Sequence, residues 1–229
     1  LLRHLMALIL GIETATKNCS VALFKDGIVI AEKEYISDGY SHAEQLTLFI
    51  QQVIDSAKIT LKKIDAVALS MGPGSYTGLR IGTSTAKGLC YALDIPLIAI
   101  STLKAMAFAM AKNEKSAIYC PMIDARRMEV FSALYDVNNK QLRGVQADVV
   151  DENTYVEFLS NEIIFFGDGS LKCQEIINHK NAKFILGINP SAKNLGILAK
   201  AKFENKDFED VAYFEPYYLK DFVAGKKKA

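Results

Sequence analysis

The sequence contains two similar openings, one near the N-terminus and one in the middle of the chain. Ala7–Thr14 is an apolar run interrupted only at its end by Glu13 and Thr14, and a hairpin-turn signal follows Glu13 after 13 residues. Ala117–Ile123 is a second apolar run, which ends at Asp124, and a turn signal follows after 12 residues. Continuous apolar runs of this length are typical of strands buried inside a sheet. The repeat predicts two related lobes, each with an acidic residue at the tip of its first strand.

The segments of the first half alternate between strand and helix patterns. Asp26-Gly27 predicts a two-residue hairpin turn, and an apolar stripe at helical spacing predicts a helix after Ser41. Ser41 and Glu44 have the spacing of a capping box at the start of that helix. Asp65–Ser70 predicts another buried strand, which is followed by a helix over 78–93. The order β-β-β-α-β-α-β-α indicates a mixed sheet with helices packed on it.

The second half continues the same alternation. Val130–Tyr135 and Ile163–Phe166 predict strands, while Ser170–Asn178 and Ser191–Lys202 predict helices. We expect an N-terminal lobe over residues 6–102 and a C-terminal lobe over 103–224, with the last segment packing back on the first lobe. Residues 1–5 and 225–229 are expected to be a leader and a solvated tail.

Composition and charge exclude several functional classes. The chain has 27 Lys and Arg residues against 26 Asp and Glu residues, and a net charge of +1 disfavours nucleic-acid binding by the chain alone. Its four cysteines are far apart, which disfavours a zinc knuckle and a redox pair. The apolar run at the N-terminus is too short to span a membrane. We therefore expect a cytoplasmic globular protein with reduced thiols.

A glycine-rich turn between the strand at 65–70 and the following helix is the most distinctive segment. It has the sequence Gly72-Pro73-Gly74-Ser75-Tyr76-Thr77-Gly78-Leu79-Arg80-Ile81-Gly82. Glycines allow the backbone to approach a ligand closely, and a helix N-terminus attracts anions. However, neither the Walker A pattern nor G-x-G-x-x-G fits, and Pro73 lacks a backbone donor. A tight turn that serves packing alone is an equal alternative.

Small residues occupy one face of the helix after this turn. Gly78, Gly82 and Ala86 follow one another at spacings of four, with Leu89 alongside. Glycine inside a helix costs about 1 kcal/mol relative to alanine. Close approach of another helix would offset this cost, and that helix belongs either to the same chain or to another subunit.

Polar residues at the two predicted strand tips are the candidate chemical groups. Glu13 and Thr14 follow the first strand, and Asp124 and Arg126 follow its counterpart. A carboxylate in such a position can hold a metal or orient a water molecule, although solvation of a hairpin explains it as well. His42 has no second histidine four residues later, so the helical metal-ligand pair is missing.

At Met71–Leu89 the sequence MGPGSYTGLRIGTSTAKGL closely resembles the signature of the bacterial TsaB family of tRNA threonylcarbamoyladenosine biosynthesis proteins. Other landmarks agree in order: ILGIETATKNCSVAL, SHAEQL, DARRMEVF, GDG and PYYL. The resemblance covers Met6 to Leu219. It implies the two-lobed α/β fold of actin, Hsp70 and sugar kinases, which is ribonuclease H-like and has a mixed five-stranded sheet in each lobe.

The resemblance also implies a role and a set of partners. It implies a non-catalytic scaffold that acts with the catalytic paralogue TsaD and the ATPase TsaE. Their complex installs threonylcarbamoyl on adenosine next to the anticodon of tRNAs that read ANN codons. We expect no activity and no cofactor in this chain alone, a metal carried by TsaD, ATP or ADP at the complex interface, and a homodimer in isolation. A small kinase or nucleotide hydrolase of the same superfamily is the alternative, while the missing histidine pair disfavours a metalloprotease.

Two groups of site residues follow from the resemblance. In the family, the first two long helices pack against those of the partner, which gives the expected interface residues Leu46, Ile50, Val53, Gly78, Gly82, Ala86 and Leu89. The strand tips and the turn give the expected nucleotide or tRNA contacts Glu13, Thr14, Gly72, Gly74, Ser75, Tyr76, Thr77, Arg80, Asp124 and Arg126. Glu13 stands where the family more often has Asp, which further disfavours a kinase-like role.

Overall fold

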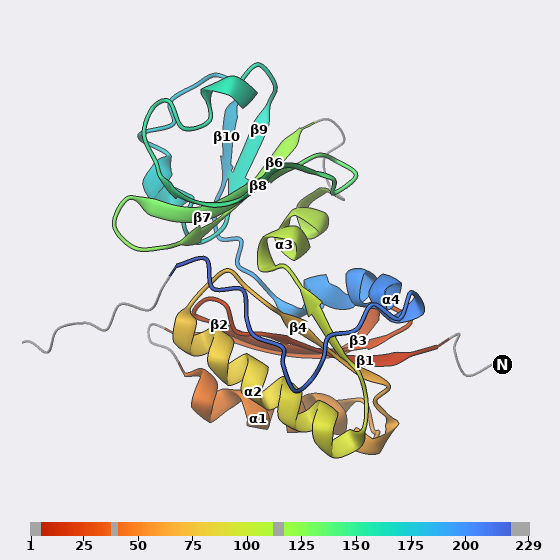
Figure 1. Ribbon diagram of the computed structural model, residues 1–229. Coiled ribbons are helices and arrows are strands. Elements are labelled where there is room, and N and C mark those ends of the chain that lie inside the picture. The colour runs from red at the N-terminus through yellow and green to blue at the C-terminus, as the bar shows by residue number, and fades with distance from the viewer. Residues whose placement is uncertain (1–5, 38–40, 112–116, 221–229) are drawn as a thin grey trace, which may run out of the picture.

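The computed structural model describes residues 6–37, 41–111 and 117–220, which form two lobes (Figure 1). The expected leader and tail lie outside the described residues. Each lobe contains a mixed five-stranded sheet, so the predicted fold class is confirmed.

The strands are β1 (Leu8–Glu13), β2 (Asn18–Lys25), β3 (Ile28–Ile36), β4 (Ala66–Ser70), β5 (Leu97–Ile100), β6 (Ile118–Asp124), β7 (Glu129–Tyr135), β8 (Gln141–Val149), β9 (Ile163–Phe166) and β10 (Ala182–Ile185). The α-helices are α1 (His42–Ser56), α2 (Tyr76–Leu93), α3 (Thr102–Ala111) and α4 (Gly196–Glu204). Short 3₁₀ helices are η2 (Leu61–Lys63), η3 (Val156–Phe158), η4 (Leu171–Cys173) and η5 (Ala192–Leu195).

The sheet of the first lobe has the strand order β3-β2-β1-β4-β5. β1 lies at its centre, antiparallel to β2 and parallel to β4. Asp26 and Gly27 form the turn between β2 and β3 with φ angles of 54° and 79°, as a two-residue hairpin of this kind requires. The predicted order of elements in the first half is therefore confirmed.

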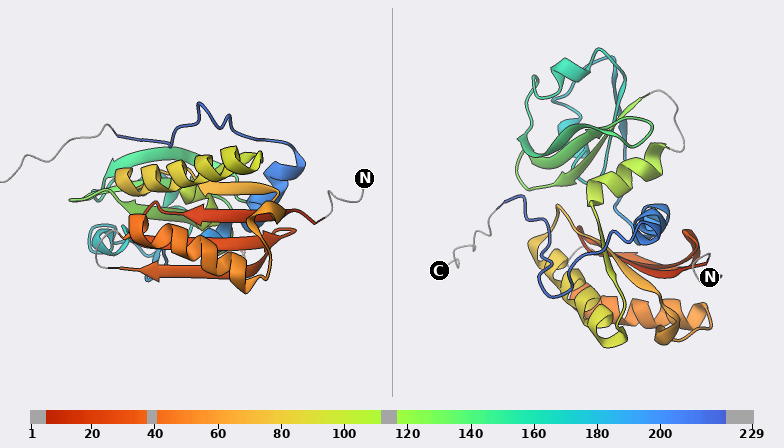
Figure 2. Two further views of the ribbon diagram at one scale, coloured as in Figure 1. Left: turned by 90° about the horizontal axis from the view of Figure 1, so that it is seen from below. Right: turned by 45° about the vertical axis from the view of Figure 1, so that its right-hand side comes forward.

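Both faces of this sheet are covered, which explains why β1 and β4 are apolar on both sides. α1 and α2 lie on one face (Figure 2), where Leu46 and Val53 share a core with Val21 of β2. On the opposite face, Leu195 and Ala199 pack with side chains of the central strands.

The second lobe repeats this plan with the order β10-β9-β6-β7-β8. β6 is antiparallel to β7 and parallel to β9, as β1 is to β2 and β4. α3 covers one face through Leu103, Met106 and Met110 and lies between the two sheets (Figure 1). The other face is covered by the β8–β9 and β9–β10 connections, through residues such as Tyr155 and Ile177.

After β10 the chain returns to the first lobe and then runs over its surface. Residues 207–220, here called the C-terminal strap, pass across α2 toward the second lobe (Figure 1). The backbone N–H of Tyr217 donates to the carbonyl oxygen of Met71 at 2.8 Å. At the end of the strap, Lys220 forms an ion pair with Glu129 of β7. The strap therefore joins both lobes beside the start of α2.

Local predictions fail where side chains find other partners. The hydroxyl of Ser41 makes no capping bond and lies 3.3 Å from that of Ser37, so the capping box is wrong. Ser191 is held extended by a 2.6 Å bond to Glu34, so the last helical segment begins after it, as η5 followed directly by α4.

The predicted helix over 170–178 is also wrong. Only the single turn η4 forms there, because the Ser170 hydroxyl bonds back to the carbonyl oxygen of Gly167 at 2.8 Å, and this turn already buries Cys173. The strands β8 and β10 have no clear sequence signal and were not predicted.

Candidate functional site

The tip of β1 places a carboxyl group in the interior of the molecule. Glu13 is 1% exposed, and its Oε1 accepts a hydrogen bond from the backbone N–H of Ala15 at 2.6 Å. Burial raises the pKa of Glu13 to about 7, and the negative charge of Asp168 in the second lobe contributes to this increase in pKa. Thr14 is fully buried beside it.

The tip of β6 brings a second carboxyl group to the junction of the lobes. One oxygen of Asp124 accepts a bond from the N–H of Arg126 at 2.9 Å and forms an ion pair with Lys172. The N–H of Asp124 donates to Asp168 at 3.2 Å. Asp168 was not among the expected site residues, although the Gly167-Asp168-Gly169 pattern directly after a strand was one of the landmarks of the family resemblance.

Arg126 occupies the hairpin loop that follows β6. Arg126 and Arg127 have φ angles of 71° and 50°, and both are exposed. The loop therefore presents two adjacent cations to solvent, next to the acidic residues of the junction.

The glycine-rich turn is closely packed against the chain itself. A Cβ atom on Gly74 would lie 2.4 Å from the carbonyl oxygen of Ala15, and one on Gly72 would lie 2.8 Å from that of Tyr217. The N–H of Ser75 donates to Ala15 at 2.6 Å, and the Ser75 side chain accepts a bond from the N–H of Gly78 at 3.3 Å. These two donors are used within the chain and cannot also bind a phosphate. Close packing accounts for Gly72, Gly74 and Ser75.

The glycine face of α2 also points into the chain's own lobe. A Cβ atom on Gly78 would lie 2.1 Å from the carbonyl oxygen of Thr14, and one on Gly82 would lie 2.3 Å from the Thr14 hydroxyl. That hydroxyl donates to the carbonyl oxygen of Gly78 at 2.8 Å. The close approach predicted for these glycines is therefore an internal contact between α2 and β1.

The predicted partner interface needs a corresponding correction. Most of its residues lie in the core of the first lobe and cannot touch another protein while the lobe is folded. Buried in this way are Leu46, Ile50, Val53, Gly78, Gly82 and Ala86. Leu89 is half-buried against the same core.

The outward face of α2 carries a third helical glycine that sequence reasoning did not single out. No atom lies within 4 Å of a Cβ built on Gly88. Thr77, Ser84 and Tyr91 are exposed on the same side, and Tyr91 is 86% exposed. Nothing within the described chain explains the cost of glycine at position 88.

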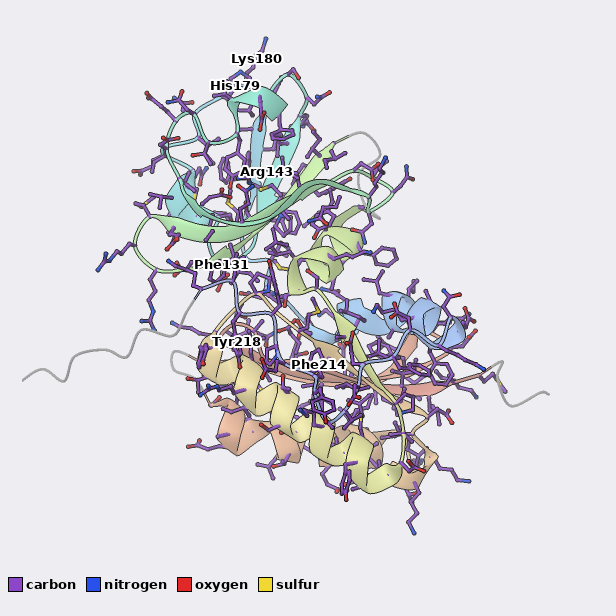
Figure 3. The ribbon with its side chains drawn as sticks, viewed as in Figure 1. Phe131, Arg143, His179, Lys180, Phe214 and Tyr218 are labelled. Atoms are coloured by element: carbon purple, nitrogen blue, oxygen red, sulfur yellow. The ribbon has the colours of Figure 1, made fainter. Side chains whose placement is uncertain are left out.

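Tyr76 and Arg80 form a small cluster at the start of α2. The ring of Tyr76 lies 4.4 Å from that of Tyr218, measured between centroids. The guanidinium of Arg80 lies 4.2 Å from the Tyr76 ring centroid and donates to the Tyr76 hydroxyl at 2.6 Å. The label of Tyr218 in Figure 3 marks where the strap meets this end of the helix.

His42 has a structural role at the start of α1. It is 1% exposed, its Nε2 lies 2.8 Å from the carbonyl oxygen of Thr16, and burial lowers its pKa. In the described part of the chain, no group of three or more His, Cys, Asp or Glu side chains could hold a metal ion. No described helix is both long and apolar enough to cross a membrane.

Comparison with known proteins gives consistent relatives. The family described as TsaD, tRNA N6-adenosine threonylcarbamoyltransferase, matches residues 38–228. The tRNA threonylcarbamoyladenosine biosynthesis protein TsaB of Escherichia coli (strain K12) is 31% identical over 226 residues, which cover 96% of this chain and 97% of the relative. TsaB of Bacillus subtilis (strain 168) is 32% identical over 225 residues, or 93% of each chain.

Solved structures give the same result at the level of the fold. The structure described as YeaZ from Pseudomonas aeruginosa superposes with a TM-score of 0.83 at 25% sequence identity. The match covers 93% of this chain and all of the other.

Proposed function

Because the chain belongs to the TsaB family of tRNA threonylcarbamoyladenosine biosynthesis proteins, we propose that it is the non-catalytic subunit that binds and activates TsaD in this process. The observation that carries this proposal is the open space above Gly88. A helix-interior glycine costs about 1 kcal/mol relative to alanine, and a partner helix that approaches the backbone there would offset that cost. The proposed docking face consists of Thr77, Ser84, Gly88 and Tyr91.

Hydrogen bonding within the chain supports a non-catalytic role. The backbone N–H groups of Ser75 and Gly78 donate within the chain, and Asp124 is paired with Lys172. We propose that the metal is carried by TsaD and that ATP or ADP binds at the interface of the complex, with no cofactor in this chain alone.

The finer parts of the proposal concern the assembly. TsaE joins the complex, which acts on adenosine next to the anticodon of tRNAs that read ANN codons. In the absence of TsaD, the same face of α2 pairs with a second copy of the chain, since an uncovered interface tends to associate with itself. The chain works in the cytoplasm, where its tRNA substrates are.

Substitution of Gly88 by leucine tests the docking face. Gly88→Leu should fold with unchanged or increased stability, because leucine suits a helix better than glycine and its side chain meets open space. It should fail to co-purify with TsaD and fail to support tRNA modification in a reconstituted reaction. Gly144→Leu is the matched control, since a Cβ atom on this exposed glycine of β8 also meets open space. Normal binding of TsaD by Gly88→Leu would show that this face is not the docking surface.

One observation favours a second function, that of a small kinase or nucleotide hydrolase. Glu13, Asp124 and Asp168 lie at the junction of the lobes, where a carboxylate could orient a water molecule toward a bound nucleotide. We expect the purified chain to turn over no ATP beyond the background of the Glu13→Gln variant. ATP turnover by the wild-type chain that Glu13→Gln abolishes would establish the alternative.

A further inference from the structure

The two sheets have four edge strands, and three of them are protected against pairing with another chain. β5 and β10 have only four residues each, and the N–H of Glu209 in the strap donates to the carbonyl oxygen of Leu97 in β5 at 2.9 Å. β3 has nine residues, but Glu32, Lys33 and Glu34 lie exposed along it. Short length and charged side chains are two ways in which proteins prevent edge-to-edge association.

β8 is the fourth edge strand (Figure 1), and it lacks both of these protections. It has nine residues, and among the described residues its backbone forms hydrogen bonds only with β7. Its two charged residues, Arg143 and Asp148, form an ion pair with each other, and their side chains are only 12% and 7% exposed. Val149 at its end is 71% exposed. A long open edge of this kind is suited to pairing with another strand.

The hydrogen bonds between β7 and β8 show which backbone groups of β8 remain unpaired. Directly after β8, the N–H of Val150 donates to the carbonyl oxygen of Met128 at 2.9 Å, so it faces β7. Backbone groups alternate between the two sides of a strand. The N–H and C=O groups of Ala147 and Val149 therefore point to the open edge.

The side chains of β8 separate into an apolar face and a polar face. Val145 and Ala147 pack against the core that contains α3. Val149 follows at the same spacing of two and therefore lies on the same face of the sheet. Gln146 and Asp148 lie on the opposite face. The open edge thus carries an apolar stripe that is buried at one end and exposed at the other.

We propose that β8 pairs antiparallel with β8 of a second copy of this chain, with the twofold axis at Ala147. Ala147 then lies opposite Ala147 of the second copy, and the two exchange both backbone hydrogen bonds. Val149 lies opposite Val145 on each side of the axis, which buries two apolar pairs. Gln146 lies opposite Asp148, so no like charges meet. The two five-stranded sheets join into one continuous sheet.

The neighbouring registers fit less well. An axis at Asp148 would place the carboxylates of the two copies directly opposite each other, and like charges in such pairs are destabilising. An axis at Gln146 would place Val149 opposite Arg143 and remove both valine pairs. The β8 edge belongs to the second lobe, whereas the proposed docking face belongs to α2 in the first lobe. Pairing through β8 is therefore independent of that face.

Sedimentation velocity of the purified chain over a series of concentrations tests this pairing. The measurement uses the Gly88→Leu background, so that association through α2 does not contribute. This chain should sediment as a concentration-dependent dimer. Adding Val149→Lys should weaken the association about a hundredfold or more, because a symmetric interface then loses two apolar contacts and gains two cations. The unfolding temperature should stay unchanged, since this side chain is exposed.

Val156→Lys is the matched control, because this valine of η3 is 56% exposed and lies outside β8, and it should leave the dimer unchanged. A mixing experiment tests the register. Chains with Val149→Lys and chains with Val145→Glu should each associate weakly, whereas their mixture should form heterodimers, because the introduced lysine and glutamate then face each other.

Three results would overturn the proposal. The first is a Gly88→Leu chain that stays monomeric at every concentration, which would leave the docking face on α2 unaffected. The second is a Val149→Lys chain that dimerises as tightly as its parent. The third is a mixture of the Val149→Lys and Val145→Glu chains that associates no more tightly than either chain alone.

Discussion

At the residue scale, Glu13 shows how the fold changes the chemistry of one side chain. Burial raises the pKa of the Glu13 carboxyl group from its ordinary value of 4.5 to about 7 in the folded chain. The folded chain therefore binds this proton more tightly than the unfolded chain does. The stability that this group contributes is therefore fully present below about pH 4.5. It is lost as the pH rises through about 7, because the folded protein must then hold a buried charge.

Replacement of this carboxyl group should remove that pH dependence. Glu13→Gln keeps an oxygen that can accept the bond from Ala15 but cannot ionise. Between pH 5 and pH 8 the free energy of unfolding of the wild type should fall by about 1–3 kcal/mol more than that of the variant. Urea unfolding at both pH values measures this difference, with the exposed Glu175→Gln as control. An equal change in wild type and Glu13→Gln would refute the assignment.

At the scale of the element, α2 contains three glycines whose surroundings differ. Gly78 and Gly82 lie against Thr14, the residue directly after β1, whereas Gly88 lies at the surface with open space around it. The helix therefore packs closely against its own sheet on one side and offers an uncovered backbone on the other. Close packing inside the lobe explains Gly78 and Gly82, whereas Gly88 needs a different explanation.

A matched pair of alanine substitutions tests this difference. Gly78→Ala should lower the free energy of unfolding by about 1–3 kcal/mol, because the new Cβ would overlap a backbone oxygen that cannot move cheaply. Gly88→Ala should raise the free energy of unfolding by up to about 1 kcal/mol, since alanine favours the helix and meets no neighbour. Thermal and urea unfolding of the isolated chain give both values. An increase in stability for both variants would contradict the packing of α2 on β1.

At the scale of the whole molecule, the two lobes are joined by α3, by the return of the chain after β10 and by the strap. The 27 Lys and Arg residues nearly equal the 26 Asp and Glu residues, so the net charge is only +1. Arg126 and Arg127 are cations that project from the β6–β7 loop beside the junction. The chain alone thus offers few contacts to a polyanion, and the tail at 225–229 with its lysines lies outside the described residues.

Binding of tRNA by the chain alone should therefore be weak and sensitive to salt. Filter binding at about 0.15 M salt should detect little complex, because affinity for nucleic acids depends on the number of neutralised phosphates. Arg126→Ala should keep the fold, since this side chain is exposed, and should reduce tRNA modification by the full complex. Tight tRNA binding without TsaD would contradict this expectation.

The sequence determined the elements whose signals are local. The apolar runs of β1, β4 and β6 and the Asp26-Gly27 turn were all predicted, because burial on two faces and a tight hairpin each require particular residue types within a few positions. The repeated opening predicted the two lobes, and the Met71–Leu89 motif predicted the family. Ser41 and Ser191 were misjudged because their hydroxyls bond to partners outside the local pattern.

Only the tertiary structure decided what each face of α2 contacts. Helical spacing puts Gly78, Gly82 and Ala86 on one side, but spacing does not say whether a sheet or another subunit lies there. The path of the strap and the nearness of Asp168 to Glu13 likewise depend on residues far apart in the chain. Such contacts arise from the packing of whole elements, and no local preference of the sequence specifies them.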